Sequence, residues 1–438
     1  MEVGGGSSLG SAAVNFNGKK YKLVVKGASS DTSSDTDVKE ALVSLFYITD
    51  VDSPFNKENY ESRVNSLIEI AEKGIPGETS DASQKVVAYL SSLENFQLND
   101  LYIHDIYPSP TDSMNIYKGY GIKFESLSDT SNSLYNTFSN IEITNNNITK
   151  TGHYGIWIKS LGLNGIDSIK NNKIEIRNCN FEYTGGSGFV PNKSSNVLVE
   201  NCIFNHTGSD IDSRMWKRGS GMWPFDSKNV VAQNNKFMNA HGPQDSYGAH
   251  IDFGNENVVF QYNFSYNNQG GFVEILGDNI NCGYRYNISV NDGYRVDPNN
   301  NQWDKKGKIF WVGNFCGNNQ TRCPSTGTFI YNNTIFVNDT LNPEIYFWPN
   351  IGDVHVYNNL IYVGSNGNKI PTLISNTLNT LDISHNIFYD SSRINLDNDL
   401  LNNALFLNPQ MMNSSILGIK STLFWNSPMA CNKVNSCA

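Results

Sequence analysis

Nine short segments of this sequence align so that one column holds asparagine seven times and cysteine twice. Within each segment, apolar and polar residues alternate before the column is reached. The column consists of Asn146, Cys179, Cys202, Asn235, Asn263, Asn287, Asn333, Asn359 and Asn386. Successive members lie 23 to 46 residues apart, which leaves room for a few short strands in each repeat but for no crossover helix. This spacing predicts a solenoid of parallel strands.

Stacking explains why one residue type recurs in the column. Equivalent residues of successive coils are expected about 4.8 Å apart, the spacing of hydrogen-bonded strands. An inward Asn at this spacing can bond its amide to the Asn of the next coil. We therefore expect the column residues to hold turns rather than to catalyse, with Cys179 and Cys202 as small buried thiols. The fold predicted is an all-β parallel β-helix of about ten coils.

The two ends of the chain depart from the repeat. The first residues are rich in Gly and Ser, as in a flexible tether. Apolar residues at helical spacing then predict helices over residues 38–47, 57–73 and 82–93. An N-terminal helical cap would cover the end of the core and an unpaired strand edge. The predicted divisions are a tether (1–14), a segment with capping helices (15–94), the β-helix (95–415) and a C-terminal tail or cap (416–438).

Charge and composition exclude several classes of partner. A net charge of -10 argues against nucleic acid and against an anionic membrane surface. No run of eighteen apolar residues is present, so no membrane span is predicted. None of the seven histidines has the spacing of a zinc site, and no metal site is predicted. Cys316 with Cys323, and Cys431 with Cys437, are close enough for loop disulfides, which an oxidising compartment would favour.

A second set of strands lies upstream of the column segments. Seven segments of four residues align there: Gly155 to Ile158, Gly188 to Pro191, Gly221 to Pro224, Ala249 to Asp252, Gly271 to Glu274, Lys308 to Trp311 and Glu344 to Phe347. The third position is apolar in all seven (Trp157, Val190, Trp223, Ile251, Val273, Phe310 and Tyr346), so we expect it to face the core. Strand alternation then turns the fourth position outward, where Asp252, Glu274 and Trp311 follow one another.

The outward column predicts a pair of carboxylates. Asp252 and Glu274 are expected about 5 Å apart on consecutive coils, with His250 on the same face as Asp252. Two carboxylates so close cannot both ionise easily, so one becomes a proton donor beside a charged partner, as glycosidic bond cleavage requires. Asp245 could replace one of the two, and His250 could orient them. Trp311 is a candidate platform for a sugar ring.

Basic and aromatic residues near this pair suggest substrate contacts. The insertion over residues 208–220 carries Arg214, Lys217 and Arg218, which could grip a sulfate or carboxylate group. His241 and Tyr247 lie in the turn before Asp252, and Arg285 lies near the end of the Glu274 coil. These residues and Trp311 form the predicted substrate-binding set. A second insertion, over residues 291–307, brings Arg295 into the same region.

The asparagine column, the coil lengths and the stretches over residues 245–253 and 270–277 resemble the right-handed parallel β-helix proteins of the pectate-lyase-like superfamily. The resemblance covers about residues 95–410 and implies a right-handed coil and action on polysaccharides. The β-helical endo-fucanases and carrageenases of marine bacteria are similar in placing acids on coil strands within a basic cleft. The Asp-rich strand and Gly-His-Gly turn of polygalacturonase-like hydrolases do not occur in this sequence.

Three functions remain open at this point, and a hydrolase is favoured. It would cleave an anionic, sulfated fucan- or carrageenan-like algal glycan internally, with Glu274 and Asp252 sharing the acid and the nucleophile or base roles and with no cofactor. A polysaccharide lyase would instead use calcium on Asp245, Asp252 and Glu274, while Lys217, Arg218 or Tyr247 removes a proton. A surface glycan-binding protein would bind without turnover.

Location is inferred from resemblance and composition. A Gly- and Ser-rich tether is typical of bacterial surface lipoproteins, although the lipidated cysteine that would precede it is absent from this sequence. We expect a secreted or cell-surface protein. The sequence does not indicate an oligomeric state.

Overall fold

The chain folds into two compact units of parallel strands. The computed structural model describes residues 2–3, 10–16, 19–25, 49–50, 94–108, 119–125, 128–129, 134–135, 138–160, 171–296, 306–318, 321–363, 372–374, 380–389 and 403–406. Unit 1 comprises residues 1–203 and 210–216, and unit 2 comprises residues 204–209 and 217–438. The strand β17 (Ile203–Asn205) leads from one unit into the other.

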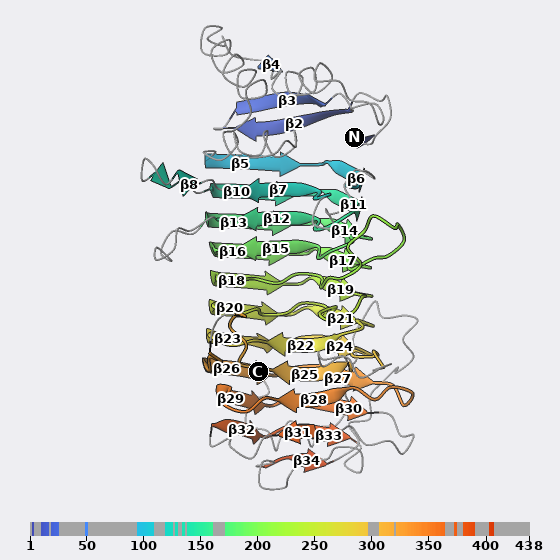
Figure 1. Cartoon of the computed structure of the whole chain (residues 1–438), viewed down its shortest axis with the longest axis vertical. Coiled ribbons are helices and arrows are strands. Elements are labelled where there is room, and N and C mark those ends of the chain that lie inside the picture. The colour runs from blue at the N-terminus through green and yellow to red at the C-terminus, as the bar shows by residue number, and fades with distance from the viewer. Residues whose placement is uncertain are drawn as a thin grey trace. The chain divides into compact units, whose positions relative to one another are not determined.

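Unit 1 contains three parallel ladders that advance by one strand per coil (Figure 1). The first consists of β5 (Glu94–Asn99), β10 (Ser139–Thr144), β13 (Asn171–Arg177) and β16 (Ser194–Glu200). The second consists of β1 (Glu2–Val3), β6 (Tyr102–Ile106), β11 (Asn147–Thr151) and β14 (Asn180–Glu182). The third consists of β7 (Ile122–Glu125), β12 (Ile156–Lys159) and β15 (Phe189–Asn192).

Antiparallel strands occur at the N-terminal edge of unit 1 and in one hairpin. There β2 (Gly10–Phe16) pairs with both β5 and β3 (Lys19–Val25), and β3 pairs with β4 (Thr49–Asp50). The hairpin is formed by β8 (Ser128–Asp129) and β9 (Leu134–Tyr135). The strand β2 begins inside the segment predicted as a tether. The three predicted cap helices and the tail over residues 416–438 lie outside the described residues.

Unit 2 repeats the three-ladder pattern. Its first ladder is β18 (Lys228–Gln233), β20 (Glu256–Gln261), β23 (Ile280–Arg285), β26 (Ser325–Tyr331), β29 (Gly352–Tyr357) and β32 (Leu381–Ser384). The second is β19 (Lys236–Met238), β21 (Phe264–Tyr266), β24 (Ile288–Val290), β27 (Thr334–Val337), β30 (Leu360–Val363), β33 (Ile387–Tyr389) and β34 (Leu405–Phe406). The third is β22 (Gly271–Ile275), β25 (Lys308–Val312), β28 (Glu344–Phe347) and β31 (Thr372–Ile374).

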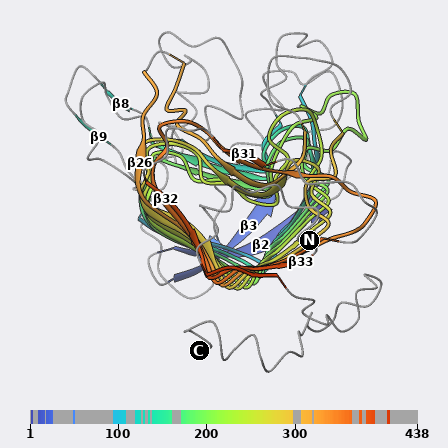
Figure 2. The same ribbon diagram turned by 90° about the horizontal axis from the view of Figure 1, so that it is seen from below.

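Viewed along the coils, the ladders of unit 2 form separate walls around its core. Figure 2 shows β26 and β32 in the first wall, β33 in the second and β31 in the third. Alternate residues of each strand point into the space between the walls, as Val258 and Phe260 of β20 do. The expected all-β parallel β-helix is therefore confirmed.

The predicted asparagine ladder is present at the turn between the first and second walls. In unit 2, Asn287 Nδ2 donates to Asn333 Oδ1 at 2.9 Å, and Asn263 Nδ2 donates to Asn287 Oδ1 at 3.0 Å. The same bond continues through Asn235, Asn263, Asn287, Asn333, Asn359 and Asn386. In unit 1, the backbone N of Cys179 donates to Cys202 Sγ at 3.4 Å. The structural role predicted for the column is confirmed.

Candidate active site

The candidate site is built on the third wall of unit 2, where Glu274 is the fourth of the five residues of β22. Its neighbours Val273 and Ile275 are fully buried in the core, so strand alternation directs the Glu274 side chain away from the core. Trp311 of β25 pairs with Glu274, as the sequence alignment predicted. The next pairing is offset: a bulge between Lys308 and Phe310 brings Tyr346 opposite Trp311.

This bulge corrects the prediction for the β28 coil. Phe347 was expected to face outward but is buried in the core, and the partly exposed Tyr346 takes the outward position instead. Trp348, directly after β28, then also points outward. The tryptophans Trp157 and Trp223, predicted as core residues, are likewise partly exposed. Tyr346, Trp157 and Trp223 were predicted as core residues because the apolar character of an aromatic side chain does not reveal which face it occupies.

The predicted pairing of Asp252 with Glu274 is wrong by two residues. Backbone bridges join Tyr247 to Gly271 and Ile251 to Ile275, so His250 lies opposite Glu274. The distance from His250 Nδ1 to Glu274 Oε2 is 3.8 Å. The two registers bury the same face, because side chains repeat every second residue along a strand. Ile251 could therefore align with either of two core residues, and the pattern of apolar residues could not distinguish them.

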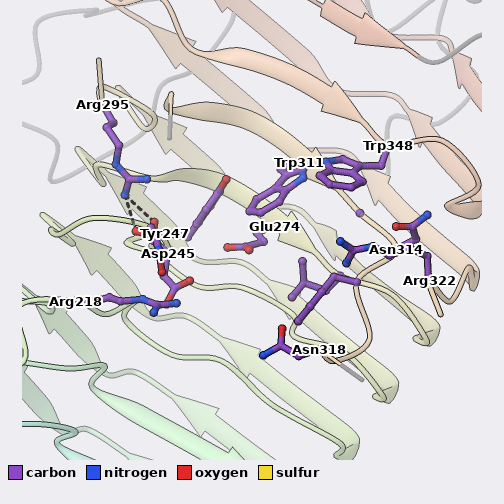
Figure 3. A pocket seen from close by; sticks show the side chains of 14 residues that line it. Arg218, Asp245, Tyr247, Glu274, Arg295, Trp311, Asn314, Asn318, Arg322 and Trp348 are labelled. Atoms are coloured by element: carbon purple, nitrogen blue, oxygen red, sulfur yellow. Dashed lines mark hydrogen bonds and ion pairs between the residues drawn. The ribbon is translucent and has the colours of Figure 1, made fainter. Parts of the chain in front are cut away.

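A cleft of about 580 Å³ opens beside Glu274 (Figure 3). In Figure 3, Glu274 lies between the pair formed by Arg218 and Asp245 on one side and the two tryptophans, Trp311 and Trp348, on the other. The complete lining consists of Arg218, Gln244, Asp245, Tyr247, Glu274, Leu276, Arg295, Trp311, Gly313, Asn314, Phe315, Asn318, Arg322 and Trp348. The cleft thus combines acidic, basic and aromatic groups.

Arginines hold Asp245 in place on one side of the cleft. Arg218 Nε donates to Asp245 Oδ2 at 2.8 Å. Arg295 Nη2 donates to the backbone carbonyls of Gly242, Gln244 and Asp245 at 2.9, 2.7 and 2.9 Å. Burial opposes ionisation of Asp245, but the charge of Arg218, with those of His250 and Arg295, brings its pKa below the ordinary value. Asp245 is therefore ionised at neutral pH.

The pKa of Glu274 is shifted in the opposite direction. Its side chain is only 3% exposed, and burial raises its pKa well above the ordinary value. The negative charges of Asp245 and Asp252 raise the pKa further. Glu274 Oε2 has no hydrogen-bond partner among the described residues. A protonated carboxyl group at this position can donate a proton to a ligand in the cleft.

His250 and Asp252 lie next to this centre. Burial lowers the pKa of His250 to about 4, so the ring is neutral at neutral pH. Ser220 Oγ lies 2.9 Å from His250 Nδ1 and accepts a hydrogen bond from the backbone N of Tyr247. Burial is also the main reason why the pKa of Asp252 rises to about 7. Asp252 is not in the lining of the cleft.

Five buried polar atoms in the lining have no hydrogen-bond partner among the described residues. They are Glu274 Oε2, Arg295 Nε, Trp311 Nε1, Asn314 Oδ1 and Trp348 Nε1. Buried polar groups in folded proteins are nearly always paired, so an unpaired set in one cleft indicates groups available to a ligand. Both donors and acceptors are present, which suits the hydroxyl groups of a sugar.

The structure brings most of the predicted site residues together. Asp245, Glu274, Tyr247, Arg218 and Trp311 all line the cleft, with His250 opposite Glu274. Four other residues of the predicted substrate-binding set are elsewhere. Arg214 belongs to unit 1, where it pairs with Asp212 and lies over the ring of Tyr107.

The remaining three belong to unit 2 but do not line the cleft. Lys217 and His241 are exposed. Arg285 lies on β23 in the first wall, where Nε donates to Gln261 Oε1 at 2.7 Å and Nη1 donates to Tyr331 Oη at 2.9 Å.

Sequence reasoning did not select Asn314, Asn318, Arg322 or Trp348. Asn314, Asn318 and Arg322 come from the loop after β25, and Trp348 follows β28 directly. The predicted disulfide between Cys316 and Cys323 closes this loop and is confirmed, whereas Cys431 and Cys437 lie outside the described residues. The cysteine pair was the available signal, because the disulfide joins two residues that follow the outward residue Trp311 in the chain.

Two further properties concern the described residues only. No three His, Cys, Asp or Glu side chains in them come together as ligands for a single metal ion. In the part of the chain that the structure describes, no helix has the length and apolar character that a bilayer span requires.

Comparison with known proteins supports the fold. A profile for the family described as right handed beta helix region matches residues 115–293, in agreement with the expected right-handed coil. No curated protein sequence gives a significant match.

Several solved structures are similar to parts of this chain at low identity. The GH136 lacto-N-biosidase from Eubacterium ramulus is 20% identical, with a TM-score of 0.44 over 62% of this chain and 43% of its own. The tailspike protein of E. coli bacteriophage HK620, in complex with a hexasaccharide, is 11% identical, with a TM-score of 0.45 over 78% and 63% of the two chains. An alginate lyase from Paenibacillus sp. is 12% identical, with a TM-score of 0.38 over 71% and 90%. This chain spans less than half the length of the lacto-N-biosidase.

Proposed function

We propose that this protein is a glycoside hydrolase that cleaves a polysaccharide in the cleft beside Glu274. The observation that carries the proposal is the contrast between two carboxyl groups of one cleft. Glu274 is buried and its pKa is raised, whereas the contact with Arg218 helps to hold the pKa of Asp245 below its ordinary value. Glycosidases use pairs of carboxyl groups whose environments separate their pKa values in this way as their catalytic groups.

The chemistry follows from these protonation states. The Glu274 carboxyl gives its proton to the glycosidic oxygen as the bond to the anomeric carbon breaks, and the leaving sugar departs as an alcohol. Asp245 acts on the other side, either by removing a proton from the attacking water or by attacking the anomeric carbon itself. In the second case water then cleaves the bond between the sugar and Asp245, which releases the product and restores the carboxylate. Arg218 and Arg295 keep Asp245 ionised and fix the backbone that carries it. Neutral His250, whose Nδ1 lies 3.8 Å from Glu274 Oε2, adds no positive charge that would lower the pKa of the acid.

The expected substrate is an anionic, sulfated fucan- or carrageenan-like glycan cut within the chain. The aromatic side chains Trp311 and Trp348 support the sugar part of this proposal, because such rings pack against the apolar faces of sugars while their N–H groups remain available to hydroxyls. The disulfide between Cys316 and Cys323 supports a secreted or cell-surface location, because disulfides persist in oxidising compartments.

The test is a panel of algal and plant polysaccharides assayed for new reducing ends and for near-ultraviolet absorbance. We expect reducing ends without absorbance, and a loss of about a thousandfold in kcat for Glu274→Gln. The matched control is Glu256→Gln, which removes an exposed carboxylate of β20 paired with Lys228. It should keep full activity.

The other outcomes identify the competing functions. An unsaturated, absorbing product would show β-elimination, for which Arg218 and Tyr247 are the predicted bases that line the cleft. Binding of a glycan without any product would mean a glycan-binding protein. Full activity of Glu274→Gln would remove the proposed acid and with it the mechanism.

A further inference from the structure

The three arginines that line the cleft are not equivalent. Arg218 is paired with the Asp245 carboxylate, and Arg295 donates to three backbone carbonyls. Arg322 makes no ion pair with any carboxylate among the described residues. Its guanidinium lies over two aromatic rings, 5.2 Å from the centre of the Phe315 ring and 5.4 Å from that of Trp348. The charge of Arg322 is therefore the one in this lining, among the described residues, that is left for a ligand.

The surroundings of Arg322 can hold a sugar unit as well as a charge. The indole N–H groups of Trp311 and Trp348 and the side-chain oxygen of Asn314 are buried without hydrogen-bond partners among the described residues. A guanidinium packed over rings keeps its N–H donors at its edge, where they can meet a carboxylate or sulfate in a bidentate manner. The groups around Arg322 thus suit an acidic sugar. The rings can pack on the sugar face, the N–H donors and the acceptor can bond hydroxyls, and the cation can bind an acidic substituent.

The loop that carries Arg322 is held by two independent constraints. The Cys316–Cys323 disulfide closes the loop, and Asn314 Nδ2 donates to the backbone carbonyl of Pro349 at 2.7 Å, next to Trp348. Together they fix the loop to the end of β28, so the guanidinium and the indole keep their relation to each other. Arg322 also lies on the opposite side of Glu274 from Asp245 (Figure 3), which keeps a bound anion away from the ionised carboxylate.

We propose that Arg322, Trp348, Trp311 and Asn314 form a subsite that recognises an acidic sugar unit of the glycan, a uronate or a sulfated residue. The inference rests on the proposed function, because this subsite belongs to the same cleft. It moves the anion-recognising role from the predicted group of Arg214, Lys217 and Arg218 to the disulfide-closed loop. It also requires that cleavage occurs next to an acidic unit bound on the tryptophan side of Glu274.

The experiment measures binding rather than turnover, in a Glu274→Gln background. The ligands are a sulfated galactan, the same polymer after desulfation, a polyuronate and the same polymer after carboxyl reduction. Arg322→Gln should weaken binding of one charged polymer at least about tenfold and leave its uncharged counterpart nearly unaffected. The polymer that responds distinguishes sulfate from carboxylate. Arg322→Lys should be intermediate, because it keeps the charge but loses the bidentate geometry.

Arg285→Gln is the matched control, because it removes the same charge from the same unit at a site bonded to Gln261 and Tyr331. It should bind like the parent protein. An equal loss of charged and uncharged polymers, no loss for Arg322→Gln, or no binding of any of the four polymers would overturn the subsite. Failure of the proposed function gives a different result: selective binding that depends on Arg322, with no reducing ends from the wild-type protein.

Discussion

The protonation states of two residues, Glu274 and Asp245, determine what the cleft can do. Glu274 owes its raised pKa first to burial, and Asp245 owes its lowered pKa to the positive charges around it. Arg218 lowers the pKa of both groups. A single substitution should therefore shift two titrations in the same direction.

This coupling makes the pH profile of the proposed hydrolase testable. Activity should rise with pH as Asp245 ionises and fall as Glu274 loses its proton, giving two limbs in kcat/KM. Arg218→Gln should move both limbs to higher pH, because both carboxylates lose a stabilising positive charge. Lys217→Gln, an exposed neighbour that does not line the cleft, is the charge-matched control. Limbs that stay in place in Arg218→Gln would contradict the assignment of both groups.

Asp252 allows a test that does not depend on activity. Its pKa is raised from 3.8 to about 7, so the folded state binds the proton more tightly than the unfolded chain. The stability that this proton contributes is fully present below pH 3.8 and is lost as pH rises through about 7. Asp252→Asn mimics the protonated form and can keep the bond from the backbone N of Phe253.

We therefore expect Asp252→Asn to have little effect on the free energy of unfolding near pH 4 and to increase it by about 1 kcal/mol at pH 8. The full pKa shift of Asp252 would imply a larger increase in the free energy of unfolding, but the partly exposed side chain keeps some hydration. Denaturant unfolding at the two pH values measures the difference. An equal change at both would mean that Asp252 is not titrating as described.

At the level of strands and turns, β22 shows how the coil positions the site. Gly271 lies at its start, opposite Tyr247, and a Cβ added there would come within 2.6 Å of the Tyr247 ring and 2.2 Å of the backbone oxygen of Lys308. The absence of a side chain therefore lets Tyr247 pack against the strand and line the cleft. The bulge in β25 has a similar effect two coils further, because it brings Trp348 to the outside.

The ladder should carry a large share of the stability of these turns. Asn287 donates Nδ2 to Phe260 O and to Asn333 Oδ1, and accepts from the backbone and side-chain nitrogens of Asn263. Asn287→Ala leaves several buried groups unpaired, and we expect a loss of about 3 kcal/mol in the free energy of unfolding. The control Gln233→Ala removes an outward bond, from Gln261 Nε2 at 2.9 Å, and should change stability by less than about 1 kcal/mol. Similar losses for both variants would argue against the ladder.

For the whole molecule, a net charge of -10 opposes binding of any polyanion. Recognition of an acidic glycan must then depend on a local contact, which the subsite around Arg322 would supply. We expect the logarithm of the binding constant for the charged polymer to fall with the logarithm of salt concentration with a slope of about -1, as for a single released counterion. Binding measured at several salt concentrations tests this expectation. A slope several times steeper would indicate an extended basic surface instead.

The fold could be predicted from the sequence because every coil of a solenoid places the same structural requirements on its residues. Each coil must place a turn residue above the last, so Asn287 and its equivalents form a column that can be recognised without coordinates. The same repetition made Glu274 and Trp311 outward neighbours, as the alignment predicted. Contacts between successive coils are thus partly a property of the repeat itself.

The remaining parts of the site depend on departures from the repeat. A register shift of two residues keeps the same face buried, so apolar patterning could not choose between Asp252 and His250 as the partner of Glu274. The bulge that exposes Trp348 and the path of the loop that carries Arg322 arise from packing between segments far apart in the chain. Protonation states also depend on the tertiary structure, because the burial and the neighbouring charges that set the pKa of Glu274 exist only after the coils have stacked.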